Sequence, residues 1–329
     1  MASNNHLVRS QNKQLVLKQL FQHESLFAAD IVKATGISMV TVNSLIRELL
    51  AEDTIIKGPL QQKNMGRPAV TYQLNVLKQQ PLLLCLIDIE GELFLHTLLV
   101  DIKGRILGEN QRIAPRTPAD FQKAVTQQLH NYPQATQIAL CIPGKINQGI
   151  VTSSWYEVFD LWPLNELMAA ITTLPFYCQN DAHLLTIGAC IHQGLSLRQT
   201  IVGIYNPEQS MPGITLLVNE TLLEGQRSLA GEAKFLPGYL DQGVPKTRTT
   251  LVNRLAEVIP FYNAAFAPHC LIVASTFPIE SSLRLALAQQ PILQKQPNQP
   301  AIYFVNDLKQ ALIFGLHWLI FHNTPYSLA

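Results

Sequence analysis

The sequence predicts two units: a winged helix-turn-helix over residues 1–76 and a larger α/β domain over residues 81–329. Near the N-terminus, two short amphipathic helices meet at a tight turn. A polar segment, residues 76–80, then leads into Pro81 and is typical of a linker. Beyond it, apolar strand-like runs alternate with helical patterns, which indicates a largely parallel or mixed sheet covered by helices on both faces.

Charge is distributed unevenly between the two units. The chain is 47% hydrophobic and 14% charged, with a net charge of +1. Residues 1–80 contain nine Lys/Arg and five Asp/Glu, whereas the remainder contains fifteen and eighteen. Positive charge therefore collects on the smaller unit, as expected of a unit that contacts phosphate.

The cysteines and the hydropathy indicate a cytoplasmic protein. No two cysteines have the spacing of a metal site or a redox pair, so we expect reduced core residues. The first residues are polar, and no uncharged run is long enough to span a bilayer, so we expect no membrane contact. The five cysteines are Cys85, Cys141, Cys178, Cys190 and Cys270.

Three helices are expected in the first unit. Residues 9–21 form an amphipathic helix that covers the next two. Residues 28–35 form the second helix, which ends at Gly36 because glycine can adopt the positive φ that reverses the chain. Ser38 caps the third by offering its hydroxyl to free backbone amides. Apolar residues recur at three- and four-residue steps up to Leu50, so one face of this third helix is buried.

The opposite face of the third helix is polar. A helix-turn-helix places such a face in the major groove of DNA, with its N-terminal residues nearest the bases. An ordinary helical hairpin is the alternative. However, the small residues Ala28 and Ala29, the turn glycine, the helix cap and the polar face occur here in the order found in a helix-turn-helix that binds DNA. We expect contacts from Ser38, Met39, Thr41, Asn43, Ser44 and Arg47.

A β-hairpin, the wing, follows these helices. Residues 54–57 and 70–74 are β-like, and the segment between them is polar and contains glycine. A cation at its tip can enter the minor groove, where negative potential concentrates; a solvated loop is the alternative. We expect DNA contacts from Lys63, Gly66 and Arg67.

The larger unit alternates strands and helices. Strands are expected at residues 82–89, 92–101, 137–142, 176–179, 200–205, 214–218 and 270–274. Helices are expected at residues 121–129, 164–171, 182–192, 251–263 and 307–322.

Several motifs resemble those of the ROK family, which comprises sugar kinases and related repressors that place a winged helix before the kinase-like fold. The resemblance implies a two-lobed, actin-like (ribonuclease H-like) α/β domain with a cleft between the lobes. It spans nearly the whole chain and rests on TGIS, TVNSLIRELL, GRP at 66–68, the strand ending at Asp88, IPG at 142–144, QNDA at 179–182 and AGE at 230–232.

The phosphate-binding motifs of the family are altered. Glu90 and Glu92 stand where the kinases have a glycine and a threonine, and two carboxylates repel a polyphosphate. The second phosphate loop, residues 207–213, contains two prolines and a glutamate, and Ala274-Ser275 replaces a glycine pair near the adenosine site. We therefore expect no nucleotide cofactor, no catalytic residues and no enzymatic activity.

The zinc ligands of the family are also missing. Phe235 stands where zinc-binding members have a histidine, and residues 239–250 contain no cysteine. Tetrahedral zinc needs four such ligands, so we expect no metal site.

The sugar pocket that the resemblance implies is half preserved. Asp181, the general base of a kinase, and Glu232 would accept sugar hydroxyls. Trp155 lies near the place of a sugar-binding asparagine and can stack on a sugar or an aromatic effector. Asn180 and Asp181 have a structural alternative as the cap of the following helix. The candidate ligand residues are thus Asn180, Asp181, Glu232 and Trp155.

The leading hypothesis is a repressor that binds palindromic double-stranded DNA as a homodimer or tetramer and senses a sugar or sugar derivative. One alternative is an active sugar kinase with an accessory DNA-binding domain. A second is a ligand-free regulator controlled by a protein partner, as related repressors of the family can be.

Overall fold

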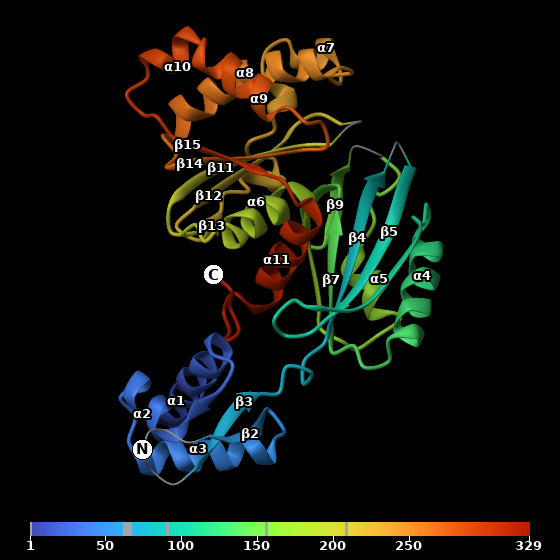
Figure 1. The fold of residues 1–329 in the computed structure, drawn as a ribbon. Coiled ribbons are helices and arrows are strands. Elements are labelled where there is room, and N and C mark those ends of the chain that lie inside the picture. Colours follow the sequence, from blue (N-terminus) through green and yellow to red (C-terminus); the bar gives the residue numbers. More distant parts are fainter. Residues whose placement is uncertain (1, 62–67, 90–91, 155–156, 208–209) are drawn as a thin grey trace.

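The computed structural model consists of a small N-terminal unit and two larger lobes (Figure 1). It confirms the expected fold class, a winged helix-turn-helix followed by a two-lobed α/β domain. None of the helices in the described part of the chain is long and apolar enough to cross a bilayer. The structure describes residues 2–61, 68–89, 92–154, 157–207 and 210–329.

The N-terminal unit combines three helices with a three-stranded antiparallel sheet in the order β1-β3-β2. The first helix begins seven residues earlier than its periodicity suggests. Strand β1 is too short to show any periodicity in the sequence. The elements are α1 (Ala2–Gln22), β1 (Leu26–Phe27), α2 (Ala28–Thr35), α3 (Met39–Ala51), β2 (Ile55–Gln61) and β3 (Ala69–Leu74).

The turn between α2 and α3 has the geometry that its sequence predicts. Gly36 lies in the left-handed region with φ 71°, and its amide donates to the carbonyl oxygen of Val32 at 2.9 Å. The three helices bury one continuous core. Its fully buried members include Val16, Leu20, Ile31, Val42, Leu45 and Leu49.

The first lobe is a mixed sheet in the order β10-β7-β4-β5-β6, with β10, β7 and β4 parallel. Edge strand β6 has a polar sequence, and the hairpin β8-β9 is short, so neither has a clear signal in the sequence. The elements are β4 (Pro81–Ile89), β5 (Glu92–Val100), β6 (Ile106–Ile113), α4 (Pro118–Asn131), β7 (Gln137–Ile142), β8 (Gly144–Asn147), β9 (Ile150–Ser154), α5 (Leu164–Ala169) and β10 (Phe176–Asn180).

The second lobe contains a sheet in the order β13-β12-β11-β14-β15, joined to the first by α6 (Asp181–His192). Its strands are β11 (Thr200–Asn206), β12 (Gly213–Val218), β13 (Thr221–Leu222), β14 (Cys270–Ser275) and β15 (Ala301–Val305). Its helices are the 3₁₀ turns η1 (Gln226–Ser228) and η2 (Ala233–Phe235), with α7 (Tyr239–Gln242), α8 (Arg248–Phe266), α9 (Glu280–Ala288), α10 (Pro291–Lys295) and α11 (Leu308–Phe321).

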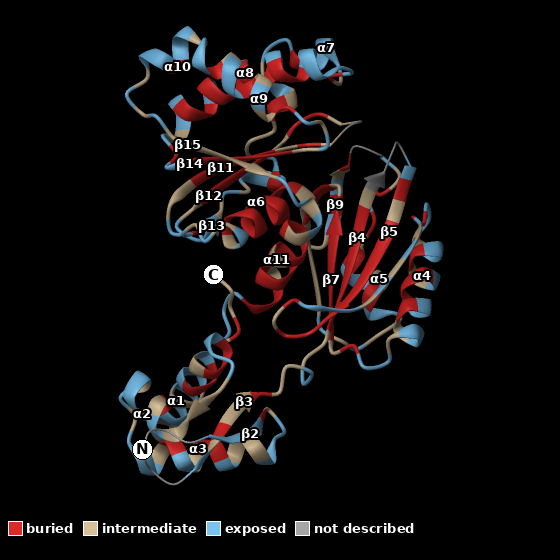
Figure 2. Ribbon diagram, in the orientation of Figure 1, coloured by how far each residue is buried: buried red, intermediate tan, exposed pale blue. Residues whose placement is uncertain are grey.

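Alternation along the strands assigns a different set of helices to each sheet face. In β4, Leu82 and Leu84 pack with α4 and α5, whereas Leu83 and Cys85 pack with α6 and α11. In the second lobe, α8, α9 and α10 cover the outer face. Helices α6 and α11 therefore form a layer between the two sheets, and Figure 2 shows buried residues running through both.

Helices α6 and α11 cross so closely that their contact requires glycine. A methyl group added to Gly188 would overlap the carbonyl oxygen of Ala311, and one added to Gly315 would overlap the backbone of Leu184. The backbones of the two helices are therefore in direct contact, and this contact fixes their separation.

The N-terminal unit packs against the C-terminal end of α11. The Phe21 ring lies 6.3 Å from the ring of His317 and 6.0 Å from that of Tyr326, measured between centroids. His317 Nε2 is 2.7 Å from the carbonyl oxygen of Ile102, which ties the first lobe to the same place. The core of the winged helix is thus continuous with the layer between the sheets.

We expect Gly315→Ala to lower the free energy of unfolding by about 1–3 kcal/mol because the added methyl overpacks the crossing. At an ordinary position inside a helix, replacement of glycine by alanine instead raises the free energy of unfolding by about 0.5–1 kcal/mol. Chemical denaturation followed by circular dichroism measures the difference. The control is Ser281→Ala on the exposed part of α9. Equal stability of Gly315→Ala and wild type would show that the two backbones do not touch.

Candidate functional site

Helix α3 presents a capped, polar N-terminal face to solvent. The Ser38 hydroxyl accepts a hydrogen bond from the backbone amide of Thr41 at 3.2 Å. Ser38, Met39, Asn43 and Arg47 are exposed, and Thr41 is half-buried. Most of the residues expected to contact DNA therefore lie together on one accessible surface, the α3 face.

Val40 is a member of this surface that the sequence analysis missed. Its side chain is 80% exposed, the largest fraction among the exposed large hydrophobic residues of the described chain. An apolar side chain at the start of a DNA-reading helix is suited to contact with a thymine methyl group. Val40 lies between the cap Ser38 and Val42, the first buried residue of α3, and this position in the sequence could have identified it as exposed.

Ser44 lies at the edge of α3 that faces α1. Its hydroxyl accepts from the Arg9 guanidinium at 3.4 Å, and Glu48, one turn further along α3, pairs with both Arg9 and Lys13. Lys13 also pairs with Glu52 at 2.7 Å. Hydrogen bonds from Lys13 and Arg9 lower the pKa of Glu48. The acidic groups of α3 are thus neutralised from α1, while Arg47 stays on the exposed side.

The wing is present as the antiparallel pair β2-β3, with a register irregularity between Lys57 and Leu60. Lys63, Gly66 and Arg67, the expected wing contacts, lie outside the described residues. Their contact with DNA stays a prediction.

A second site lies in the cleft between the lobes, at the N-terminus of α6. Here the structure brings together Asn180, Asp181 and Glu232, which line one small cavity of about 100 Å³. Trp155, the fourth candidate ligand residue, lies outside the described residues.

Asn180 caps α6, as the structural alternative predicts. Its side-chain oxygen accepts from the amides of Ala182 and His183 at 3.0 and 3.3 Å, and its amide nitrogen donates to the carbonyl oxygen of Gly144 at 3.0 Å. Both the oxygen and the nitrogen of the Asn180 side-chain amide therefore bind groups within the protein. The same nitrogen donates to Asp181 Oδ1 at 3.0 Å, which positions that carboxylate.

Asp181 lines the cavity from the first position of α6. Burial raises the pKa of its carboxyl group to about 6, although the Ala182 amide, the charge of Lys145 and the Asn180 amide oppose this. Burial, with the nearby charge of Lys145, lowers the pKa of His183 to about 3, so the imidazole is neutral. His183 Nδ1 is 3.1 Å from the Thr215 hydroxyl, within the core.

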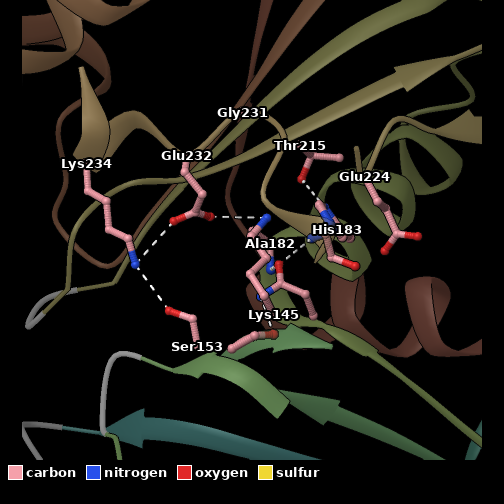
Figure 3. A network of polar contacts seen from close by, with 12 residues as sticks. Lys145, Ser153, Ala182, His183, Thr215, Glu224, Gly231, Glu232 and Lys234 are labelled. Atoms are coloured by element: carbon pink, nitrogen blue, oxygen red, sulfur yellow. Dashed lines mark hydrogen bonds and ion pairs between the residues drawn. The ribbon is translucent and has the colours of Figure 1, made fainter. Parts of the chain in front are cut away.

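Glu232 is held between two lysines that the sequence analysis missed (Figure 3). Its Oε1 is 3.2 Å from Lys145 Nζ, and its Oε2 is 3.4 Å from Lys234 Nζ. Lys234 also donates to the Ser153 hydroxyl at 3.3 Å. Lys145 and Ser153 belong to the β8-β9 hairpin of the first lobe, so these contacts join the two lobes across the cleft.

A second, more open hollow of about 450 Å³ lies beyond the C-terminal ends of β14 and β15. Its walls include Ser275, the second residue of the Ala274-Ser275 pair that replaces the expected adenosine-site glycines, together with Arg248 and Phe277. Within the described ranges, no three His, Cys, Asp or Glu side chains come together as a metal site would need.

Asp181→Asn tests the buried carboxyl group. Folding raises this pKa from an ordinary 3.8 to about 6, so the carboxylate destabilises the folded state increasingly as pH rises through that range. We expect the neutral variant to be more stable than wild type above pH 6, by about 2–3 kcal/mol. The difference should vanish below about pH 4. Urea denaturation across pH measures it, with Asp241→Asn at an exposed position as the control; a pH-independent difference would contradict the burial of Asp181.

Comparison with known proteins agrees with this architecture. Residues 86–235 match the model of the ROK family. The xylose repressor of Bacillus spizizenii is 23% identical over 239 residues, which cover 68% of this chain and 60% of the repressor. The chain thus spans about 60% of the length of the curated relatives it matches.

The solved structures that share the fold include a transcriptional regulator and a kinase. A ROK family transcriptional regulator, a homologue of the E. coli MLC protein, superposes with a TM-score of 0.71 and 18% identity over 98% of this chain and 97% of its own. A putative N-acetylmannosamine kinase from Listeria monocytogenes gives a TM-score of 0.60 and 17% identity over 74% of this chain and 99% of its own. Residues 86–235 thus match the ROK family model, and the whole chain shares its fold, a winged helix-turn-helix before a two-lobed domain, with a solved ROK family transcriptional regulator.

Proposed function

We propose that this protein is a sequence-specific DNA-binding repressor whose two-lobed domain serves dimerisation and the sensing of a small molecule. The observation that carries the proposal is the α3 face, where Ser38, Asn43 and Arg47 are exposed on a helix whose other side is buried. Asparagine and arginine are the side chains that pair bidentately with adenine and guanine in the major groove.

The charge arrangement around α3 supports this role. Phosphate repels carboxylates, and Glu48 and Glu52 are both paired with cations of α1. Among the described residues, Arg47 makes one side-chain hydrogen bond, to the carbonyl oxygen of Asn43 at 3.3 Å, which leaves most of its guanidinium donors for a ligand. The positive balance of the first 80 residues favours the same partner.

Specific binding requires more than one winged helix, because a single unit reads few base pairs. Two copies on a palindrome provide the area and the half-site spacing that operators of this kind need. The similarity to proteins named xylose repressor favours repression and a sugar-related effector. We place the boundary between the DNA-binding and effector units in residues 75–80, where β3 gives way to β4.

An effector in the cleft would reach the winged helix through α11. Leu312 of this helix lines the cavity, and His317, on the same helix, contacts Phe21 of α1. A ligand that binds one lobe arrangement better than another would change how α11 supports α1, and so the placing of the two recognition helices in a dimer.

A sugar kinase is the second candidate, because Asp181, to which the family resemblance assigns the role of general base, lines the cavity, and kinases share the fold. Against it, Glu232 is engaged by Lys145 and Lys234 rather than free for sugar hydroxyls. The acidic phosphate turn at Glu90 lies outside the described residues, so only its sequence weighs against nucleotide binding. Control by a protein partner without a ligand is the remaining possibility for the same scaffold.

Arg47→Ala tests DNA recognition. We expect affinity for DNA selected by the wild type from a random pool to fall about tenfold, with relaxed preference at one base pair, because a bidentate contact is worth about 1–3 kcal/mol. Electrophoretic mobility shift and repeated selection measure both effects. The control is Arg198→Ala, an exposed arginine paired with Glu220 far from α3. Unchanged affinity and preference would show that α3 does not read DNA.

The kinase alternative is tested by incubating the purified protein with ATP, magnesium and a panel of pentoses and hexoses. We expect no sugar phosphate above the level given by Asp181→Asn, with mass spectrometry as the readout. Phosphorylated sugar that forms with the wild type and is lost in Asp181→Asn would establish the kinase instead.

A further inference from the structure

The cavity in the cleft is lined by two lysines as well as by the two carboxylates expected of a sugar site. Lys145 and Lys234 both point at Glu232, one from each lobe (Figure 3). The side chain of Lys145 is only 7% exposed. Two ammonium groups therefore share one carboxylate beside the cavity, and among the described residues Asp181 is the other acidic side chain that lines it.

The buried ammonium of Lys145 has unused donors. An ammonium group carries three N–H donors, and Glu232 Oε1 is the partner found for it among the described residues. A buried charge with few partners is costly, so the site favours an acceptor group delivered from the cavity. Lys234, with a side chain that is 24% exposed, can turn toward the same group.

A neutral sugar would fit this arrangement poorly. To reach Glu232 its hydroxyls would have to displace the lysines from their ion pairs with that carboxylate, and a hydrogen bond from a neutral donor is roughly half as strong as one from a charged donor. The lysines would then be left with hydroxyl oxygens alone. A ligand with an anionic group would instead take the place of Glu232 as the charged partner of the lysines. Its hydroxyls could then donate to the carboxylates of Asp181 and Glu232.

We propose that this cavity binds a small polyol carrying a carboxylate or phosphate group, with the anion between Lys145 and Lys234 and hydroxyls donating to Asp181 and Glu232. The inference rests on the effector role proposed above for the same cleft. The cavity of about 100 Å³ is smaller than the ~300–1,000 Å³ of typical small-molecule sites. Binding therefore separates Glu232 from at least one lysine, and with it loosens the ion pair that joins the lobes.

The test is a titration of the full-length protein, by calorimetry and thermal shift, with matched probes. The probes are five- and six-carbon aldonates, uronates and sugar phosphates, the corresponding neutral sugars, and inorganic phosphate alone. We expect at least one acidic polyol to raise the melting temperature, and the neutral sugar and inorganic phosphate to bind at least about tenfold more weakly. Comparison of the carboxylates with the phosphates identifies the anion.

Two lysine variants locate the anion, and a third is the control. Lys145→Met and Lys234→Met should each weaken the acidic polyol about tenfold or more, because each removes a charged hydrogen bond. Lys309→Met removes a lysine that is also paired with a glutamate, Glu109, but lies on the exposed start of α11, so it should bind as wild type does. If Lys145→Met does not fold, Lys234→Met still tests the position of the anion, because Lys234 is only partly buried and its replacement is less disruptive.

Several results would overturn the proposal: neutral sugars binding as tightly as the acids, inorganic phosphate matching them, no acid binding at all, or both cavity variants keeping wild-type affinity. A mobility shift on selected DNA separates this failure from that of the repressor function. An acid that binds without changing DNA affinity would leave the cavity assignment in place and remove the effector role. A protein that binds no DNA would remove the repressor function alone.

Discussion

The contact between α6 and α11 is the constraint on which the rest of the structure depends. Gly188 and Gly315 let the two backbones touch, so the layer between the sheets has one permitted thickness. The N-terminus of α6 carries Asp181, and α11 contributes Leu312 to the same cavity. The spacing of the lobes, the shape of the cleft and the position of the winged helix are therefore set by one crossing of two helices.

The cleft brings Asp181 and Glu232, the expected acceptors of sugar hydroxyls, into one cavity together with two lysines. Glu232 lines the same cavity as Asp181, yet its carboxylate bridges two lysines from different lobes. Buried ion pairs contribute little net stability, because desolvation offsets their attraction. Here the pair of Lys145 with Glu232 joins the two lobes, so a ligand that separated these two side chains would also remove a contact between the lobes.

Local signals in the sequence were sufficient for the winged helix. The turn glycine Gly36, the cap Ser38 and the helical spacing of Val42, Leu45 and Leu49 each have a short-range cause, and each appears in the structure as expected. Alternation of apolar strands and helices was likewise sufficient for the α/β class, whereas the two lobes were implied only by the resemblance to the ROK family. Signals of this kind act within a few residues, which is why the sequence alone reveals them.

Features that depend on tertiary contact were not predictable in the same way. Strand β6 is polar because it lies at a sheet edge, and the hairpin β8-β9 is too short for a periodic pattern. The pairing of Lys145 with Glu232 joins separate lobes, and that of Arg9 with Glu48 joins separate helices, so neither leaves a local pattern. Ser44 is polar like the exposed residues around it, so the sequence did not reveal that its hydroxyl contacts Arg9 of α1.

The aromatic contact among Phe21, His317 and Tyr326 has a consequence for synthesis of the protein. Phe21 leaves the ribosome early, and the rings that cover it follow only after nearly all the intervening sequence has been translated. A nascent chain thus holds a winged helix whose outer surface is still uncovered. The helix α11 that anchors this unit is made last, so a stalled or shortened translation product would carry the residues proposed to bind DNA without the contacts that support them.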